Sequence, residues 1–198
     1  MNRYAITDGS VSFLRDRRLA EALAARCGEL AREGVAYVLV REKQLSAGEL
    51  AEVCRVVLQA VRGAGTATKV LVAGRLDVAV AVGADGVNLS GAVGELTALQ
   101  AREMMPEAFV SVSCHSVADI VQASAGGADA VLFGPVFGKR VDGVEVLPAV
   151  GLEALREACR VAGESPVFAL GGVSAENAAE CVAAGAAGVA GIRMFFAR

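Results

Sequence analysis

The sequence predicts a single α/β domain over residues 1–198, folded as a (β/α)8 TIM barrel without the final helix. Short apolar runs rich in Val, Ile and Leu alternate with longer amphipathic runs along the whole chain. The short runs show no in–out alternation, which is typical of parallel strands buried on both faces. Eight such runs with seven helices between them favour a closed barrel. A doubly wound open sheet is the competing topology, but its dinucleotide-binding form would carry GxGxxG after the first strand, and this sequence does not.

The predicted elements follow one another in strict strand–helix order. The predicted strands lie at residues 3–7, 35–41, 69–72, 86–90, 109–113, 130–134, 166–172 and 188–192. The predicted helices lie at residues 15–34, 46–63, 76–82, 94–105, 116–125, 152–162 and 175–185. Residues 135–148 are expected to form a loop.

Helix positions rest on periodicity and on capping residues. Apolar side chains recur on one face of the first helix, at Leu19, Leu23, Cys27 and Leu30. Ser46 precedes the second helix with Glu49 three residues later, which is the spacing of a capping box. Ser174 is predicted to cap the last helix.

The last predicted strand is followed only by a few residues that include Phe195 and Phe196. A complete barrel of this type has an eighth helix over its last and first strands. We therefore expect either a partner subunit over this gap, as in a homodimer, or a barrel that is partly open. Apolar surface near the two phenylalanines would suit a subunit contact.

Composition excludes several classes of function. The net charge is −3, aromatic residues make up 5% and there is no Trp, so nucleic acid is not an expected partner. The five cysteines are scattered without CxxC spacing, which argues against a zinc site or a disulfide framework. The N-terminus lacks an apolar signal region, and no uncharged apolar run approaches the ~20 residues of a membrane span. A cytoplasmic protein with no membrane partner is the simplest interpretation.

Polar residues gather where the predicted strands end, which is where barrels of this type carry their chemistry. Gly171 and Gly172 precede the predicted last helix, so their backbone N–H groups could hold a phosphate, although a plain tight turn has the same signature. Arg41 and Lys43 could bind a second anionic group such as pyrophosphate; a solvated charged run is equally compatible with the pattern.

The only histidine is His115, in the run SVSCHS after the fifth strand. Imidazole can take and give a proton near neutral pH, so His115 is a candidate catalytic acid–base residue, whereas the alternative is a hydrogen-bonded structural histidine. Ser113 and Ser116 flank it and could bind substrate or orient the ring. Cys114 is expected to be packed rather than reactive. No close pair of acids predicts a metal site.

Six ordered motifs resemble the family of thiamine-phosphate synthases and TenI-type thiazole tautomerases. They are RYAITD, YVLVREK, AGRLDVAVAVGADGVNLS, SVSCHS, GADAVLFGPVF and PVFALGGVS. The resemblance implies a (β/α)8 barrel, a dimer and a phosphorylated thiazole ligand in thiamine biosynthesis. It also implies that His115 matches the proposed acid–base residue of the tautomerases. Gly191, Ile192 and Arg193 fall where the family contacts the phosphate, with Arg193 in place of a usual serine.

Departures from the synthase motifs favour the tautomerase branch. The synthases have Asn-Asp-Arg where this chain has AGR, and GVHLGQ followed by an acid where it has GVNLSGAVG. Both carboxylates that hold magnesium in the family are therefore missing. Of the synthase pyrophosphate loop only Lys139 is retained. We expect an isomerase, a thiazole tautomerase that needs no metal or redox cofactor. The alternatives are a transferase, thiamine-phosphate synthase with Mg²⁺, and a barrel that binds thiazole or thiamine phosphate without catalysis.

Overall fold

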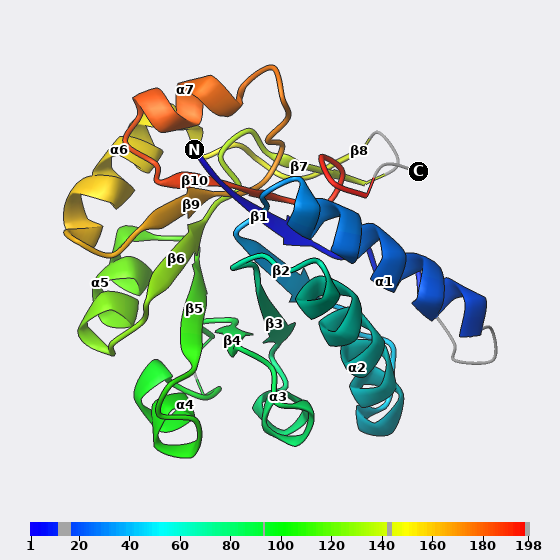
Figure 1. Cartoon of the computed structure of the whole chain (residues 1–198). Helices are drawn as coiled ribbons and strands as arrows, with labels where there is room; N and C mark the ends of the chain where they lie inside the picture. The colour runs from blue at the N-terminus through cyan, green and yellow to red at the C-terminus, as the bar shows by residue number, and fades with distance from the viewer. Residues whose placement is uncertain (12–16, 93, 142–143, 197–198) are drawn as a thin grey trace.

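A computed structural model shows a closed barrel of eight parallel strands, which confirms the predicted fold (Figure 1). The structure describes residues 1–11, 17–92, 94–141 and 144–196. The barrel strands are β1 (Asn2–Ile6), β2 (Tyr37–Val40), β3 (Lys69–Ala73), β4 (Gly86–Leu89), β5 (Phe109–Cys114), β6 (Ala130–Phe133), β9 (Val167–Ala169) and β10 (Gly188–Gly191). Around the barrel they follow one another in chain order, and β10 closes the ring against β1.

The seam between β1 and β10 is fully paired, from Asn2 opposite Gly188 to Ala5 opposite Gly191. The expectation of a partly open barrel is therefore wrong. Val189 and Ala5, on the two strands at the seam, are completely buried within the chain itself. At Gly188 an added Cβ would lie 2.1 Å from the backbone oxygen of Asn2, so the two strands approach closely only because this residue has no side chain.

Seven helices lie outside the barrel in the described part of the chain (Figure 1). They are α1 (Arg17–Arg32), α2 (Ala47–Gly63), α3 (Leu76–Val82), α4 (Ala98–Met104), α5 (Val117–Ala125), α6 (Gly151–Ala162) and α7 (Ala178–Ala183). In α1 the predicted apolar face is confirmed except at Leu19, which is 41% exposed. The capping box of Ser46 and Glu49 is present at the start of α2. None of the described helices is both long and apolar enough to cross a membrane.

The last helix begins later than predicted. α7 starts at Ala178, and its N-cap residue is Asn177, whose side chain makes no capping hydrogen bond. Ser174 lies in the preceding turn, where its backbone N–H donates to Asn177 Oδ1 at 2.8 Å. The prediction that Ser174 caps the helix is wrong because this turn separates it from the helix.

The segment expected to be a loop, residues 135–148, contains an antiparallel hairpin of β7 (Lys139–Val141) and β8 (Val144–Leu147). The sequence carries a signal for it that the loop prediction overlooked. Asp142–Gly143 lies between Lys-Arg-Val and Val-Glu-Val-Leu, and Asp-Gly is a preferred hairpin turn. The hairpin lies outside the barrel sheet.

Side chains from alternate positions fill the barrel interior. Near the amino ends of the strands Tyr4, Tyr37, Phe109 and Phe168 form an aromatic layer, with Tyr37 and Phe109 stacked at a centroid distance of 4.6 Å. Leu39, Leu71 and Leu132 continue the packing. This layer closes one end of the barrel, so a ligand can enter the interior only from the carboxyl ends of the strands.

After β10 the chain folds back on the barrel. Phe195 is 5% exposed and packs in the apolar cluster that α1 and α2 form with the neighbouring strands. Arg26 on α1 donates from Nε to the backbone oxygen of Phe195 at 3.2 Å. Exposed apolar surface was expected at Phe195, and this expectation is wrong; Phe196 is partly buried against the same cluster. The expected dimer stays a prediction.

Candidate active site

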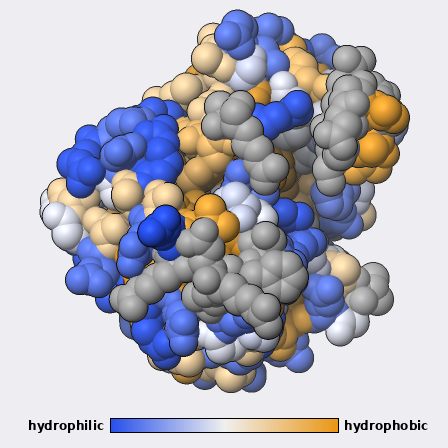
Figure 2. Space-filling model, turned by 90° about the vertical axis from the view of Figure 1, so that its right-hand side faces the viewer, coloured by the Kyte–Doolittle hydropathy of each residue, from blue (hydrophilic) through white to orange (hydrophobic). Residues whose placement is uncertain are grey.

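The parallel strands bring their carboxyl ends to one end of the barrel, which we call the mouth. The arrows of β1 and β2 point to this end in Figure 1, and Figure 2 shows the same end face-on, hollowed near its centre. Arg41 follows β2, Ser113 lies on β5 and His115 follows β5. Because Leu39 and Ser111 point into the barrel, side-chain alternation directs Arg41, Ser113 and His115 towards the same side. The structure thus places three residues predicted from the sequence at the same end of the barrel.

His115 is held at two points. Its Nδ1 lies 2.6 Å from the backbone oxygen of Gly134 on the neighbouring strand segment. Its backbone N–H donates to Asp119 Oδ2 at 2.9 Å. Since a carbonyl oxygen can only accept, the proton of the neutral ring sits on Nδ1, and Nε2 keeps a free lone pair. The exposed imidazole is therefore set up to take a proton through Nε2.

Asp119 is a site residue that the sequence interpretation missed. Its carboxylate accepts the backbone N–H groups of His115 and Ser116, both at 2.9 Å. Burial alone would raise the pKa of Asp119, but these hydrogen bonds and one from the Ser116 side chain lower it below the ordinary value. The predicted substrate-binding residue Ser116 is the N-cap of α5, where its hydroxyl accepts from the Asp119 N–H at 3.2 Å. The SxxD spacing was a readable signal for this capping box.

Arg41 is half-buried at the mouth, and Lys43 is exposed. Between them Glu42 turns inward and is only 2% exposed. Its carboxylate accepts from the Thr7 hydroxyl at 2.6 Å and from the Val11 N–H at 3.1 Å. Burial raises the pKa of Glu42, although these hydrogen bonds act in the opposite direction. Thr7 Oγ1 also accepts the Arg41 N–H at 2.9 Å, so Glu42 and Thr7 together fix the backbone that carries Arg41.

Gly171 and Gly172 end the strand segment after β9, with φ values of 89° and 68°. A Cβ on Gly172 would lie 2.7 Å from the Phe137 backbone oxygen, so both conformation and space require glycine there. The N–H groups of Gly172 and Val173 have no hydrogen-bond partner among the described residues. α7 is short and begins only at Ala178, so the phosphate prediction rests on these loop N–H groups and not on a helix terminus.

The adjacent strand β10 ends in Gly191, followed by Ile192 and Arg193. Gly191 is buried, and Arg193 is exposed. Ile192 O accepts the backbone N–H groups of Phe195 and Phe196, while those of Arg193 and Met194 have no partner in the part of the chain that the structure describes. With the loop after β9 they give two neighbouring sets of free backbone donors, which we call the backbone cradle (the N–H groups of residues 172, 173, 193 and 194).

Two predicted residues need separate mention. Lys139 begins β7, but its side chain lies outside the described residues, so its substrate role stays a prediction. Cys114 is fully buried, and burial raises the pKa of its thiol to about 12. A thiol in that environment stays protonated, which agrees with a packed and unreactive cysteine.

Magnesium does not fit the described side chains at the mouth. No group of three His, Cys, Asp or Glu side chains able to hold a metal occurs among them. Asp77 is held by Arg75 through two hydrogen bonds of 2.9 and 2.6 Å. Glu95 accepts a short hydrogen bond from the Ser90 hydroxyl. The carboxylates nearest to the missing metal ligands in sequence are thus already engaged with neighbouring side chains.

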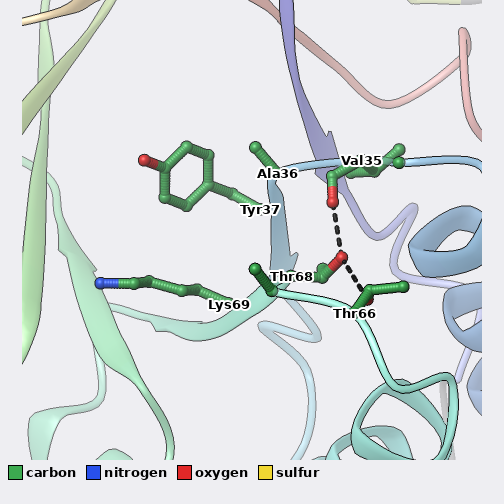
Figure 3. A pocket seen from close by; sticks show the side chains of 8 residues that line it. Val35, Ala36, Tyr37, Thr66, Thr68 and Lys69 are labelled. Atoms are coloured by element: carbon green, nitrogen blue, oxygen red, sulfur yellow. Dashed lines mark hydrogen bonds between the residues drawn. The ribbon is translucent and has the colours of Figure 1, made fainter.

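Two depressions lie at the opposite end of the barrel. One of about 240 Å³ is lined by residues including Tyr37, Thr68 and Lys69, and one of about 420 Å³ is lined by residues including Lys69 and Asp85. In Figure 3 Thr68 donates to the Val35 oxygen and Tyr37 and Lys69 extend side by side. Both depressions are shallow and open. They face the amino ends of the strands, away from His115 and the free backbone donors, so the mouth remains the candidate active site.

Comparisons with known proteins identify the family. The family model described as thiamine monophosphate synthase matches residues 4–195. Thiamine-phosphate synthase from Methanoculleus marisnigri is 36% identical over 94% of this chain and 83% of its own length. Thiamine-phosphate synthase from Moorella thermoacetica is 38% identical over 79% of this chain and 72% of its own.

Solved structures extend the likeness to three dimensions. Thiamine phosphate pyrophosphorylase from Pyrococcus furiosus superposes with a TM-score of 0.77 at 30% identity, over 97% of this chain and 85% of that one. N-acetylmannosamine-6-phosphate 2-epimerase from Clostridium perfringens, at 10% identity and a TM-score of 0.70, shares the fold alone. From the family match over residues 4–195 and these relatives, the chain belongs to the thiamine monophosphate synthase family.

Proposed function

We propose that this protein is a thiamine-phosphate synthase, a transferase that couples hydroxymethylpyrimidine pyrophosphate to thiazole phosphate. The observation that carries the proposal is the likeness to proteins named thiamine-phosphate synthase, 36% identical over 94% of the chain. This replaces the tautomerase as the leading interpretation, because the relatives carry the synthase name even though this chain lacks the expected metal carboxylates. The mouth offers the anion-binding groups that both phosphorylated substrates need.

In this reaction the thiazole nitrogen forms a bond to the methylene carbon of the pyrimidine, and the carbon–oxygen bond to pyrophosphate breaks. The leaving pyrophosphate takes the electron pair, so positive groups near it lower the barrier. Arg41 and Lys43 follow β2 at the mouth and can supply that charge. The backbone cradle, after β9 and β10, suits the thiazole phosphate, and in the ring of strands only β1 separates β10 from β2. His115 follows β5, which lies between β2 and β9 on the longer way round the ring. Its Nε2 must first take a proton before it can give one to the leaving pyrophosphate.

The test is to mix the purified protein with both substrates and follow thiamine phosphate by chromatography, in magnesium buffer and with EDTA. Formation of thiamine phosphate above the rate without protein supports the proposal. Absence of product in magnesium-replete buffer, with both substrates intact, would dispose of it.

A second candidate is the thiazole tautomerase, favoured by the state of His115. The ring donates from Nδ1 to Gly134 O, and Nε2 has no hydrogen-bond partner in the part of the chain that the structure describes. One such nitrogen suffices to take a proton from the ring carbon between nitrogen and sulfur and to return one to the exocyclic carbon of a carboxythiazole phosphate. No metal is needed for this proton shift.

The tautomerase is tested with the non-aromatic carboxythiazole phosphate by following the ultraviolet absorbance of the aromatic product. A rate above background that survives EDTA would establish this activity, and no rate would exclude it. Binding of thiazole phosphate without turnover in either assay would instead favour a non-catalytic binding protein.

A further inference from the structure

A chain of hydrogen bonds runs through the barrel interior to the mouth. The Tyr4 hydroxyl lies 2.9 Å from Ser111 Oγ, and Ser111 Oγ lies 2.9 Å from Asn88 Oδ1. Asn88 Nδ2 lies 3.1 Å from Ser113 Oγ. Tyr4 and Ser111 are completely buried and Asn88 is 8% exposed, whereas Ser113 is half-buried at the mouth. The chain therefore begins where water is excluded and ends where a ligand can bind.

The direction of this chain follows from counting protons. Tyr4 and Ser111 each carry one hydroxyl proton. Two hydrogen bonds are available for these two protons, one between Tyr4 and Ser111 and one between Ser111 and Asn88. If Asn88 turned its NH₂ group towards Ser111, that contact would already hold an amide proton. One hydroxyl proton would then be buried with no acceptor among the described residues, which is costly.

Tyr4 keeps its proton under all ordinary conditions. Burial raises its pKa well above the usual range, although the contact with Ser111 acts in the opposite direction. Since Ser111 gives its own proton to Asn88 Oδ1, the Tyr4 proton occupies the contact between Tyr4 and Ser111, and Tyr4 is the donor there. The amide must present Nδ2 to Ser113, whose oxygen accepts it. The proton of the Ser113 hydroxyl is left free to point into the mouth.

We propose that Asn88 is a positioning residue that makes the Ser113 hydroxyl a hydrogen-bond donor to an oxygen of a phosphate or pyrophosphate group bound at the mouth. The choice of ligand rests on the proposed function, while the direction of the chain rests on Tyr4, Ser111 and Asn88 alone. Neither Asn88 nor Tyr4 was predicted as a site residue from the sequence. A ligand group that can only donate a hydrogen bond would be disfavoured at Ser113.

The binding test measures the Kd of thiazole phosphate and of inorganic pyrophosphate by calorimetry. Ser113→Ala removes the donor and should weaken at least one of the two ligands about tenfold or more. Asn88→Asp replaces the amide donor by an acceptor, turns the Ser113 proton inward and should weaken the same ligand to a similar extent. The double variant Asn88→Asp with Ser113→Ala should lose little beyond either single variant.

The control is Ser124→Ala, the same chemical change on α5, where the buried Ser124 oxygen has no partner in the described structure. It should leave both Kd values unchanged. If Asn88→Asp weakens binding by the same factor with and without the Ser113 hydroxyl, its added charge is responsible and the proposal is overturned. Equal Kd values for Ser113→Ala and the unmodified protein would overturn it as well.

A second readout needs no ligand and separates this inference from the proposed function. NMR of the Asn88 side-chain amide should show its hydrogen-bonded proton shifted upfield in Ser113→Ala, because that proton loses its acceptor. Ser111→Ala should move it less, since Ser111 contacts the amide oxygen. The reverse pattern would show that Asn88 donates to Ser111 and would overturn the inference. Failure of both ligands to bind the unmodified protein, with the expected NMR pattern intact, would count against the function only.

Discussion

At the mouth, His115 is held by a backbone oxygen of the neighbouring strand segment and by the carboxylate of Asp119. Gly134 O fixes the ring through Nδ1, and Asp119 fixes the main chain of His115. Nδ1 of the ring is thus held in place, while Nε2 has no hydrogen-bond partner among the described residues. The catalytic role of His115 stays a prediction.

We expect His115→Asn to lower kcat by about 10²–10⁴-fold in whichever of the two reactions the protein catalyses, with a much smaller change in KM. Asn can keep the hydrogen bond to Gly134 O, so the loop should stay folded. Steady-state kinetics with the matching substrates measures the effect. Unchanged kcat would show that His115 is structural.

Arg41→Ala should raise the KM of the pyrophosphate substrate about ten- to hundredfold, because a charge-assisted hydrogen bond contributes roughly 1.5–3 kcal/mol. Arg41→Lys should recover part of the loss, since it keeps the charge but not the planar fork. The comparison is made from initial rates at varied pyrophosphate substrate. A KM that does not respond to either change would place the pyrophosphate elsewhere.

Individual residues were predicted unevenly from the sequence. The position of His115, Arg41 and the glycine pair at the strand ends could be predicted from the sequence, whereas their roles in binding or catalysis stay predictions. Asn88 and Asp119 could not, because their roles depend on partners on other strands or on main-chain N–H groups. Ser116 was predicted to bind substrate because it lies beside His115. Its hydroxyl caps α5, and its role in binding stays a prediction.

At the scale of elements, α5 and the loop before it form one unit through Asp119. Asp119→Ala should destabilise the protein by about 1 kcal/mol at pH 7, as loss of a helix cap does. The folded-state pKa of Asp119 is lowered, so its contribution is complete above the ordinary Asp pKa of about 3.9 and is lost as pH falls through the folded value. Urea unfolding between pH 7 and pH 3 should show the free energies of unfolding of Asp119→Ala and of the unmodified protein converge as the pH falls. A difference that persists unchanged in acid would contradict this account.

Element positions were largely predictable, since the apolar runs mark strands and the amphipathic runs mark helices. The errors came where local signals competed. Ser174 looked like a cap, but the turn before α7 places Asn177 there instead. The hairpin of β7 and β8 was hidden inside a run of charged residues that suggested a loop.

At the scale of the whole molecule, barrel closure depends on one seam. Gly188→Ala would bring a Cβ to 2.1 Å from the backbone oxygen of Asn2, so β1 and β10 must separate. We expect a loss of about 3 kcal/mol or more, because both strand pairing and core packing suffer. Thermal unfolding measures it.

The matched control is Gly48→Ala on α2, where an added Cβ meets no atom within 4 Å. It should leave stability unchanged or raise it by up to about 1 kcal/mol, since Ala favours helix. Similar melting temperatures for both alanine variants would mean that the seam tolerates separation.

The closed barrel could be predicted from the number of strands. Which residues bury the seam between β1 and β10 could not. An absent eighth helix suggested an open barrel or a partner subunit. The structure buries Val189 and Ala5 without either, and Phe195 packs back beside α1. Burial of the seam in this way requires glycine and other small residues that let the two strands approach closely. The periodicity of apolar residues does not predict such an approach.

The backbone cradle has a consequence for how this protein can change and be inhibited. The donors of the cradle are main-chain N–H groups, so exchanging the side chains at residues 173, 193 or 194 leaves these donors in place. Alanine substitutions at these residues would therefore not reveal their contribution to binding. If the cradle holds the phosphate as proposed, affinity for that group would persist while the surrounding side chains diverge, whereas selectivity for the ring attached to it would change with them. An inhibitor for this mouth should keep its phosphate unchanged and seek discrimination in the part that meets Arg41, Ser113 and His115.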